Sequence, residues 1–445
     1  MPQNVVLLTI DSLRAERFLR PGALDALDNL DRVASGPGGV RFSRAFATGP
    51  GTTPSFPGIL TGTLPLSQGG WEPMRDDRPF LARTCADAGL ATGGFTSNPF
   101  LSSNFNYDTG FDRFSDYQNP LMGIATRLFP RGIEVRTPAL QRLDDYFHFT
   151  TALRKGYELI AGKSRPYVPA DVITDDTVAW LDETDEPFFC WSHYMDVHHP
   201  CFPPAEYRER FDVPESVTAE DIGELYSTFV RDSPALADDD VTLLERIYDA
   251  AIDYVDDQIG RILDTLERKG VLDETLVVIT SDHGELFGEH DEYAKPERLY
   301  DELLHVPLIV GNAPDAVKPG RDDLVSLLDV PAMIRHALDI QGDDDSAVPG
   351  VDPARDCVLA EHKRGDDVIV GARGVDYRFE VDRIRGEERI YRLNDGETLV
   401  DPGTVPAEVL ETLRERVNDR LAEIDLSPVD LDLDDDVEGR LEDLG

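Results

Sequence analysis

The sequence predicts an α/β protein built on a large, mostly parallel β-sheet sandwiched by helices. Short apolar runs occur at Val5–Ile10, Pro187–Ser192 and Val277–Ile279, which suits parallel strands buried on both faces. Longer segments with apolar residues at helical spacing separate these runs, as expected of crossover helices. Each run ends abruptly in polar residues, and ligands of open α/β sheets bind beyond the carboxyl ends of the strands.

The remaining elements follow from the same periodicities. Apolar residues recur every three or four positions over 79–90, 170–181, 241–269 and 329–338, and we expect helices there. Gly270 is the expected C-cap of the longest helix. Further strands are expected at 91–97 and 306–311, and a long loop at 100–114.

The chain divides into two predicted parts. Residues 1–345 form the larger domain, with a helical or loop insertion at 100–165, and residues 346–445 form a C-terminal α+β subdomain with an acidic tail. The subdomain is expected to hold an antiparallel sheet and a terminal helix, from segments 358–359, 368–371, 377–381, 389–393 and 406–424. Within the insertion, 121–165 is basic and aromatic. We favour a packed helical insertion over a cap that binds an anionic or amphiphilic substrate.

The composition excludes some classes of protein. The 445 residues carry 43 Lys+Arg against 87 Asp+Glu, a formal net charge of −44, so no nucleic acid is expected as a partner. Because the acid is spread along the chain, we predict a halophilic source with a surface adapted to high salt. The sequence shows no signal-peptide pattern and no apolar run near 20 residues. We therefore predict a cytoplasmic protein without an integral membrane segment.

Two strands are followed directly by candidate metal ligands. Asp282 and His283 follow the Val277–Ile279 run, and Asp11 follows the first strand. A carboxylate and an imidazole at a strand end make a plausible half of a metal site. Taken alone, either aspartate could instead be the N-cap of a helix.

A third strand leads into a cluster of histidines. Pro187–Ser192 is followed by His193, His198 and His199, with Asp196 between them. A single histidine would be interpreted as a structural group, but three beside an aspartate are hard to explain by packing.

The segment 47–62 is expected to begin a helix. Gly49, Pro50 and Gly51 precede Thr52 and Pro54, and apolar residues follow. The free N–H groups of a helix N-terminus suit an anion. A hydroxyl there could act as a nucleophile if a metal lowers its pKa, although an ordinary threonine cap would explain the residue equally well.

Together these motifs resemble the sulfatase branch of the alkaline phosphatase superfamily. The resemblance spans nearly the whole chain in matching order and spacing. Its carriers are the segments 4–14, 52–62, 187–200, 248–261, 280–290 and 299–308.

The resemblance implies roles for individual residues. The implied metal ligands are Asp11, Asp282 and His283, completed by the oxygen of Thr52, which stands at the nucleophile position. His198 matches the residue that protonates or holds the leaving-group oxygen. The other implied contacts to the substrate come from Lys295, which matches a lysine on the transferred anionic group, and from His305, His193 and Arg14.

The sequence departs from the sulfatase pattern at the nucleophile. Sulfatases carry C-x-P-S-R or S-x-P-S-R, where the first residue is oxidised to formylglycine, whereas this chain reads T-T-P-S-F with Phe56 in place of the arginine. Threonine cannot give an aldehyde, so no formylglycine is expected. The G-K motif is also missing, and Asn98-Pro99-Phe100 stands after the 91–97 strand. Threonine nucleophiles and an Asp-His ligand pair are features of the phosphodiesterase, phosphonate hydrolase and phospho-group transferase branches.

The expected cofactor is one divalent metal ion, Ca²⁺, Mn²⁺ or Zn²⁺, and the histidine ligand favours the latter two. For a second ion, His193, Asp196 and His362 are the plausible donors.

We predict a metal-dependent hydrolase that cleaves phosphate or phosphonate esters through a covalent Thr52 intermediate. The substrate would be a small-molecule or a glycan- or lipid-linked anionic ester. The alternatives are a sulfuric ester hydrolase with an unmodified threonine, a transferase of phospho-groups to a glycan or lipid, and a non-catalytic binding homologue.

Overall fold

The computed structural model describes residues 2–424, with gaps at 20–26, 68–69, 71–72, 118–166, 186, 231–235, 318–322, 343–345, 365–366, 384 and 395. The basic, aromatic segment 121–165 and the acidic tail therefore lie outside the described residues. Within the described residues, no helix is both long and apolar enough to cross a membrane.

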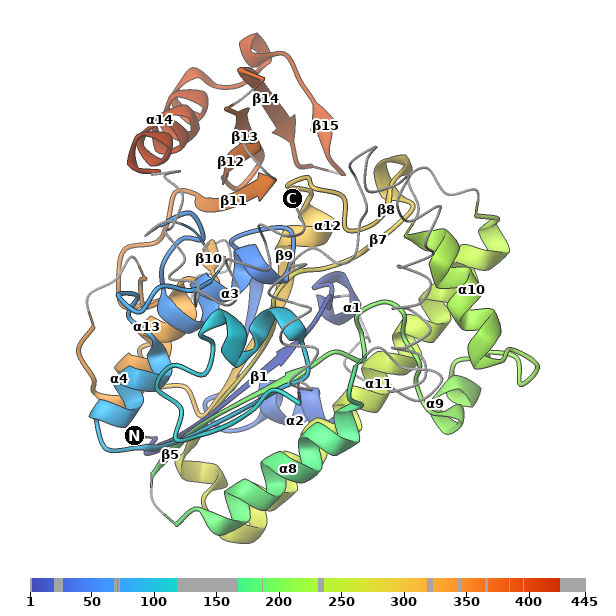
Figure 1. The fold of residues 1–445 in the computed structure, drawn as a ribbon. Helices are drawn as coiled ribbons and strands as arrows, with labels where there is room; N and C mark the ends of the chain where they lie inside the picture. The colour runs from blue at the N-terminus through green and yellow to red at the C-terminus, as the bar shows by residue number, and fades with distance from the viewer. Residues whose placement is uncertain are drawn as a thin grey trace, which may run out of the picture.

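An eight-stranded sheet forms the centre of the molecule (Figure 1). Its spatial order is β10-β2-β9-β6-β1-β5-β3-β4. Strand β9 is antiparallel to β2 and β6, and the other neighbours pair in parallel. The predicted mostly parallel sheet is thus confirmed. The strands are β1 (Asn4–Ile10), β2 (Val40–Phe46), β3 (Ala91–Thr96), β4 (Arg113–Ser115), β5 (Phe188–Tyr194), β6 (Thr275–Ser281), β9 (His305–Gly311) and β10 (Val325–Ser326).

Helices cover both faces of this sheet (Figure 1). One face packs against α2 (Asp28–Ser35), α8 (Ala170–Glu183) and α11 (Asp238–Lys269). The other packs against α3 (Thr52–Thr61), α4 (Leu81–Asp87) and α13 (Asp329–Leu338). Because strand side chains alternate between faces, Val6 and Leu8 of β1 join the first core and Val5 and Leu7 the second. Both neighbours of β1 are strands, so its run of apolar residues is fully buried.

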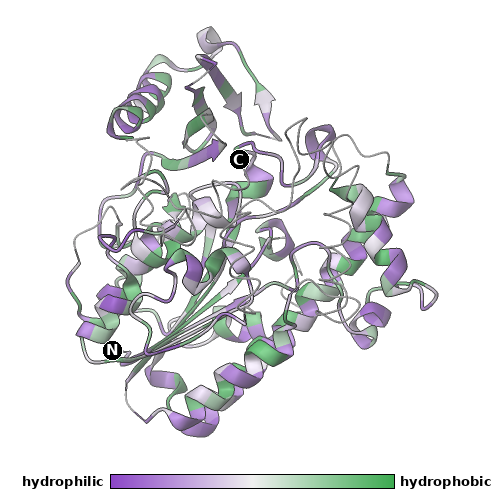
Figure 2. Cartoon of the chain, viewed as in Figure 1, coloured by the Kyte–Doolittle hydropathy of each residue, from purple (hydrophilic) through white to green (hydrophobic). Residues whose placement is uncertain are grey.

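Smaller elements lie around the sheet. They are α1 (Glu16–Leu19), α9 (Ala205–Arg210), α10 (Ala219–Phe229), α12 (Asp301–Leu304) and a hairpin of β7 (Leu286–Phe287) and β8 (Tyr293–Ala294). In Figure 2 hydrophobic and hydrophilic residues alternate along α8 and α11, which pack against each other and the sheet with their apolar sides. This is the amphipathic pattern predicted for both helices.

The C-terminal subdomain has its own antiparallel sheet and core, as predicted. Strands β11 (Val358–Arg364), β12 (Asp367–Arg373), β13 (Tyr377–Asp382), β14 (Glu387–Arg392) and β15 (Thr398–Leu399) pair in chain order. Helix α14 (Ala407–Glu423) packs on this sheet. Leu413 and Val417 of α14 meet Val370 and Phe379 in this core.

One local expectation is corrected, and two alternatives are excluded. The predicted loop at 100–114 ends within the edge strand β4, whose three residues are too few to show a period in the sequence. Asp282 caps no helix, because the chain continues from β6 into β7. Thr52 is the first residue of α3, and Gly51 occupies its N-cap position.

Candidate active site

Three neighbouring strands deliver the polar residues of the site. Strand β1 lies between β5 and β6 in parallel register, with Thr9 opposite His193 and Ile10 opposite Ser281. The carboxyl ends of the three strands therefore lie side by side. Asp11, His193 and Asp282, separated by 182 and 89 residues along the chain, become neighbours for this reason.

Four of these side chains form a fully buried cluster, here called the strand-end group: Asp11, His193, Asp282 and His283. Ligand atoms of Asp11, His193 and Asp282 lie within 4.8 Å of one another. His283 Nε2 lies 3.5 Å from both Asp11 Oδ1 and Asp282 Oδ2. Asp282 Oδ2 is buried and, among the described residues, has no hydrogen-bond partner. Asp11, His193 and Asp282 are thus close enough to share one ion, and His283 lies beside both carboxylates. Carboxylate and imidazole donors, together with the unpartnered oxygen of Asp282, fit a divalent metal ion.

Ser12 orients both carboxylates. Its backbone N–H donates to Asp282 Oδ1 at 3.2 Å, and its hydroxyl donates to Asp11 Oδ1 at 2.9 Å. The N–H of His283 also donates to Asp282 Oδ1, at 2.9 Å. These bonds use the Oδ1 atoms and leave Asp282 Oδ2 for the centre. Ser12 makes both contacts from a left-handed backbone, with φ of 63°, which costs about 1–3 kcal/mol for a residue other than glycine.

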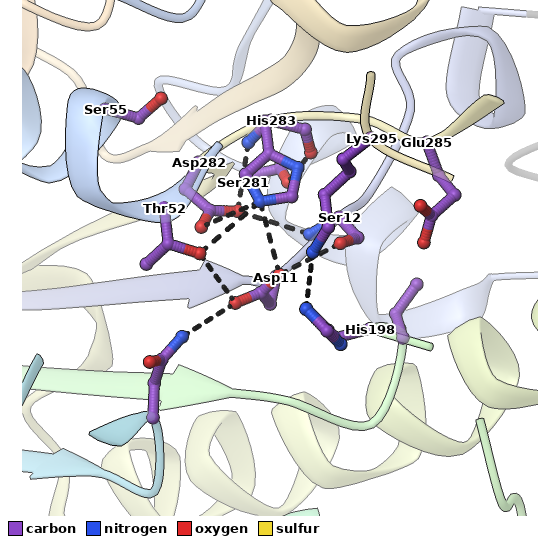
Figure 3. Close-up of polar contacts among 12 residues, drawn as sticks. Asp11, Ser12, Thr52, Ser55, His198, Ser281, Asp282, His283, Glu285 and Lys295 are labelled. Carbon is purple, nitrogen blue, oxygen red and sulfur yellow. Dashed lines mark hydrogen bonds and ion pairs between the residues drawn. The ribbon is translucent and has the colours of Figure 1, made fainter. Parts of the chain in front are cut away.

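The hydroxyl of Thr52 faces the strand-end group (Figure 3). Its Oγ1 lies 3.3 Å from Asp11 Oδ2 and 3.4 Å from His283 Nε2. The turn before α3 is held by Thr48, which donates to Pro54 O at 2.9 Å, and by Ser55, which donates to Gly49 O at 2.9 Å. A Cβ at Gly49 would lie 2.4 Å from Pro54, so only glycine fits this turn. The hydroxyl is thus fixed within reach of any ion that the cluster holds.

His198 and Lys295 form a pair beside this centre (Figure 3). Lys295 Nζ donates to His198 Nε2, and His198 Nδ1–H donates to the backbone oxygen of His199. Lys295 directly follows β8, so the β7–β8 hairpin places it. The pair offers a shared proton next to the Thr52 hydroxyl and the strand-end group.

The pKa values of the cluster differ strongly. Burial, and then the charge of Asp11, raise the pKa of Asp282 to about 7. Burial also raises the pKa of Asp11, but the surrounding basic groups, led by His198, hold it well below its usual range. Burial and Lys295 lower the pKa of His283 to about 4, so its imidazole is neutral at pH 7. A neutral imidazole is the form that binds a metal.

The structure thus brings together Asp11, Thr52, Asp282 and His283, with His198 and Lys295 beside them. Of the three residues expected to bind substrate, His193 joins the strand-end group, and Arg14 and His305 contact other side chains. His193 faces Asp11, with Nε2 3.3 Å from Oδ2. Arg14 donates to Glu289 Oε1 at 2.7 Å, and His305 stacks on Phe46 with ring centres 5.0 Å apart.

The sequence analysis missed three contributors. Asn98 Nδ2 donates to Asp11 Oδ2 at 3.1 Å, although the sequence analysis noted this residue only for the missing G-K motif. Its place directly after the 91–97 strand was an available clue. Thr9 Oγ1, 2.9 Å from His193 Nδ1, and Ser12 carried no signal, because single hydroxyl residues near strand ends are common.

A family model described as Sulfatase matches residues 3–340. The chain belongs to the sulfatase family. The uncharacterized sulfatase YidJ of Escherichia coli is 26% identical over 355 residues, which cover 76% of this chain and 66% of the relative. The choline-sulfatase of Rhizobium meliloti is 23% identical over 348 residues, which cover 71% and 64%. The chain spans about two thirds of the length of these curated relatives.

Solved structures share the sulfatase fold with this chain. BT4656, solved in complex with D-glucosamine-2-N,6-O-disulfate, has a TM-score of 0.65 at 16% identity, covering 95% of this chain and 98% of that one. The phosphonate monoester hydrolase of Agrobacterium radiobacter has a TM-score of 0.63 at 18% identity, covering 95% of each chain. The fold is therefore common to proteins named for sulfate esters and for phosphonate esters.

Proposed function

We propose that this member of the sulfatase family is a metal-dependent hydrolase of phosphate or phosphonate esters that uses Thr52 as its nucleophile. The observation that carries the proposal is the position of Thr52 Oγ1, 3.3 Å from Asp11 Oδ2 and 3.4 Å from His283 Nε2. Threonine has no route to an aldehyde, so a hydroxyl nucleophile is the chemistry that this position supports.

Asp11, Asp282 and His283 would hold the metal ion, and the two carboxylates with imidazole favour Mn²⁺ or Zn²⁺ over Ca²⁺. Such an ion neutralises the anionic group of the ester and lowers the pKa of a hydroxyl that it touches. The Thr52 hydroxyl releases its proton to solvent, and its oxygen attacks phosphorus in line, forming one P–O bond as the bond to the leaving oxygen breaks. The His198–Lys295 pair supplies the proton that the leaving oxygen takes. Water cleaves the Thr52 ester in a second step and restores the hydroxyl.

Thr52→Ala tests this proposal against a panel of nitrophenyl phosphate diesters and phenylphosphonates. We expect kcat to fall at least about a thousandfold, and Thr52→Ser to recover part of it. Thr53→Ala changes the adjacent hydroxyl and is the matched control, expected to stay near the unaltered protein. Full activity in Thr52→Ala would exclude the covalent mechanism. Elemental analysis of the purified protein identifies the metal.

Family membership and the likeness to a choline-sulfatase favour a second candidate, hydrolysis of a sulfate ester by the unmodified threonine. The relative rates on nitrophenyl sulfate and bis-nitrophenyl phosphate decide between the two. A higher kcat/KM on the sulfate would replace the lead proposal.

A further inference from the structure

A second histidine–carboxylate pair lies next to the site. His199 Nδ1 is 2.8 Å from Oε2 of Glu285, whose side chain is 2% exposed. Glu285 belongs to the turn that carries Asp282 and His283, and His199 directly follows His198. Because a carboxylate accepts, the Nδ1–H of His199 donates to it. The buried acid therefore fixes the orientation of the His199 ring.

The peptide of His199 in turn fixes His198. The backbone oxygen of His199 accepts the Nδ1–H of His198. This bond leaves Nε2 of His198 to face Lys295, which donates to it. The two imidazole rings lie 4.5 Å apart with an interplanar angle of 30°. Where His198 points thus depends on where His199 is held.

Two aromatic residues of α10, Tyr226 and Phe229, pack against His199 and are here called the aromatic wall. The His199 ring stacks on Tyr226 at 6.4 Å and meets the edge of Phe229 at 5.7 Å. Phe229 also packs on Phe287 and Tyr293 of the β7–β8 hairpin, which carries Lys295. His199 is thus held between Glu285 and this wall, and the wall also supports the element that places Lys295.

We propose that Glu285 is a positioning residue that, by anchoring His199, holds His198 Nε2 on Lys295, so that the proton between them lies at the leaving-group oxygen. This role presupposes the ester hydrolysis proposed above. As the bond from phosphorus to the leaving oxygen breaks, that oxygen takes the proton shared by His198 and Lys295, and solvent replaces the proton. Glu285 itself touches neither substrate nor reacting atoms.

The test uses a series of phosphate diesters whose leaving groups range from nitrophenol to simple alcohols. A nitrophenolate leaves without a proton, whereas an alkoxide requires one. We expect Glu285→Ala to lower kcat by only a few-fold on nitrophenyl esters and by about a hundredfold on alkyl esters, the scale of general acid catalysis. The dependence of kcat on leaving-group pKa therefore steepens, with KM nearly unchanged. Glu285→Gln keeps an accepting oxygen and is expected to restore most of the lost rate.

A matched control exists in the same region. His290 Nε2 and Glu302 Oε2 form a similar pair at 3.0 Å, outside the contacts of His198. Glu302→Ala is expected to leave the leaving-group dependence unchanged. His199→Phe, which keeps the packing on Tyr226 but lacks the nitrogen, is a second variant expected to steepen the dependence as Glu285→Ala does.

Equal losses on all leaving groups in Glu285→Ala would overturn the positioning role. So would loss of bound metal in that variant by elemental analysis, since Glu285 lies two residues from His283. The proposed function is tested separately, by the activity of Thr52→Ala on nitrophenyl esters. Full activity in that variant would contradict the proposed function and not only the role of Glu285.

Discussion

Two groups of buried charges in this protein are balanced in opposite ways. In the C-terminal subdomain and the adjoining α12, carboxylates are paired with arginines. Arg378 donates to Glu397 Oε2 at 2.7 Å, and Arg373 donates to Asp301 Oδ2 at 2.8 Å. We call these four residues the arginine group. The pKa of Asp301 lies below its usual value, because the two arginines offset the effect of burial.

The strand-end group has two aspartates but no arginine partner among the described residues. Burial and Lys295 lower the pKa of His283 to about 4, and burial with the charge of Asp11 raises the pKa of Asp282 to about 7. Burial differs between the groups, because the strand-end side chains are fully buried whereas the side chain of Asp301 is 23% exposed. The arginine partners add to this contrast. We infer from this difference that the arginines neutralise one group permanently, whereas the other group is arranged for the divalent cation that the proposed function requires.

The largest effect is expected from removing one carboxylate of the strand-end group. Asp282→Asn is expected to lower kcat about ten-thousandfold, on the scale of 1.36 kcal/mol per factor of ten. It should also abolish the rise in melting temperature on adding Mn²⁺ or Zn²⁺, because ligands that bind only the folded state stabilise it. A chelator should lower the melting temperature of the unaltered protein to that of the variant. Retained metal-dependent stabilisation in Asp282→Asn would contradict the contrast.

Substitutions in the arginine group should lower the stability of the protein and leave metal binding unchanged. Arg378→Ala leaves Glu397 buried without its partner, and we expect a loss of about 3–5 kcal/mol in the free energy of unfolding, measured with urea. The exposed pair of Arg268 and Asp182 is the control, and Arg268→Ala should cost less than about 1 kcal/mol. Similar losses in both variants would show that burial of the arginine group is irrelevant.

Another buried carboxylate, outside both groups, sharpens the comparison through pH. Asp256 of α11 accepts the backbone N–H of Asn29 and of Leu30 at the start of α2, and burial raises its pKa to about 6. Since the pKa of this group is lower in the unfolded chain, near 3.8, its contribution to stability is full below about pH 4. The contribution is lost as the pH rises through 6, and the loss is at most about 3 kcal/mol.

Asp256→Asn should therefore remove part of the fall in unfolding free energy between pH 4 and 6. Asp264→Asn, on the exposed side of the same helix, is the control. An unchanged pH profile in Asp256→Asn would mean that the native pKa is not raised.

The smallest expected effect concerns Ser12, whose strain serves the strand-end group. Ser12→Gly relieves the left-handed backbone and should stabilise the metal-free protein by about 1 kcal/mol. It also removes the hydroxyl bond to Asp11, and metal affinity measured by calorimetry should fall about tenfold. Ser12→Ala keeps the strain and loses the same bond, so affinity should fall without a gain in stability. Unchanged affinity in both variants would show that the hydroxyl does not orient Asp11.

Most elements of the fold could be predicted from local pattern. The runs Val5–Ile10 and Val306–Gly311 and the helix 329–338 lie within one residue of β1, β9 and α13. Strand β4 could not be predicted, because three residues are too few to show a hydrophobic periodicity. The antiparallel direction of β9 could not be predicted from its apolar run either, because parallel and antiparallel central strands are equally buried.

The sequence by itself determined which residues could bind a metal or attack an ester. Asp11, Asp282 and His283 follow apolar strands, and Thr52 begins a helix after a glycine-rich turn. Only the tertiary structure decided that His193 joins the aspartates while Arg14 and His305 turn to Glu289 and Phe46. Contacts of this kind depend on strand register and side-chain direction, which link residues hundreds of positions apart and leave no trace in local spacing.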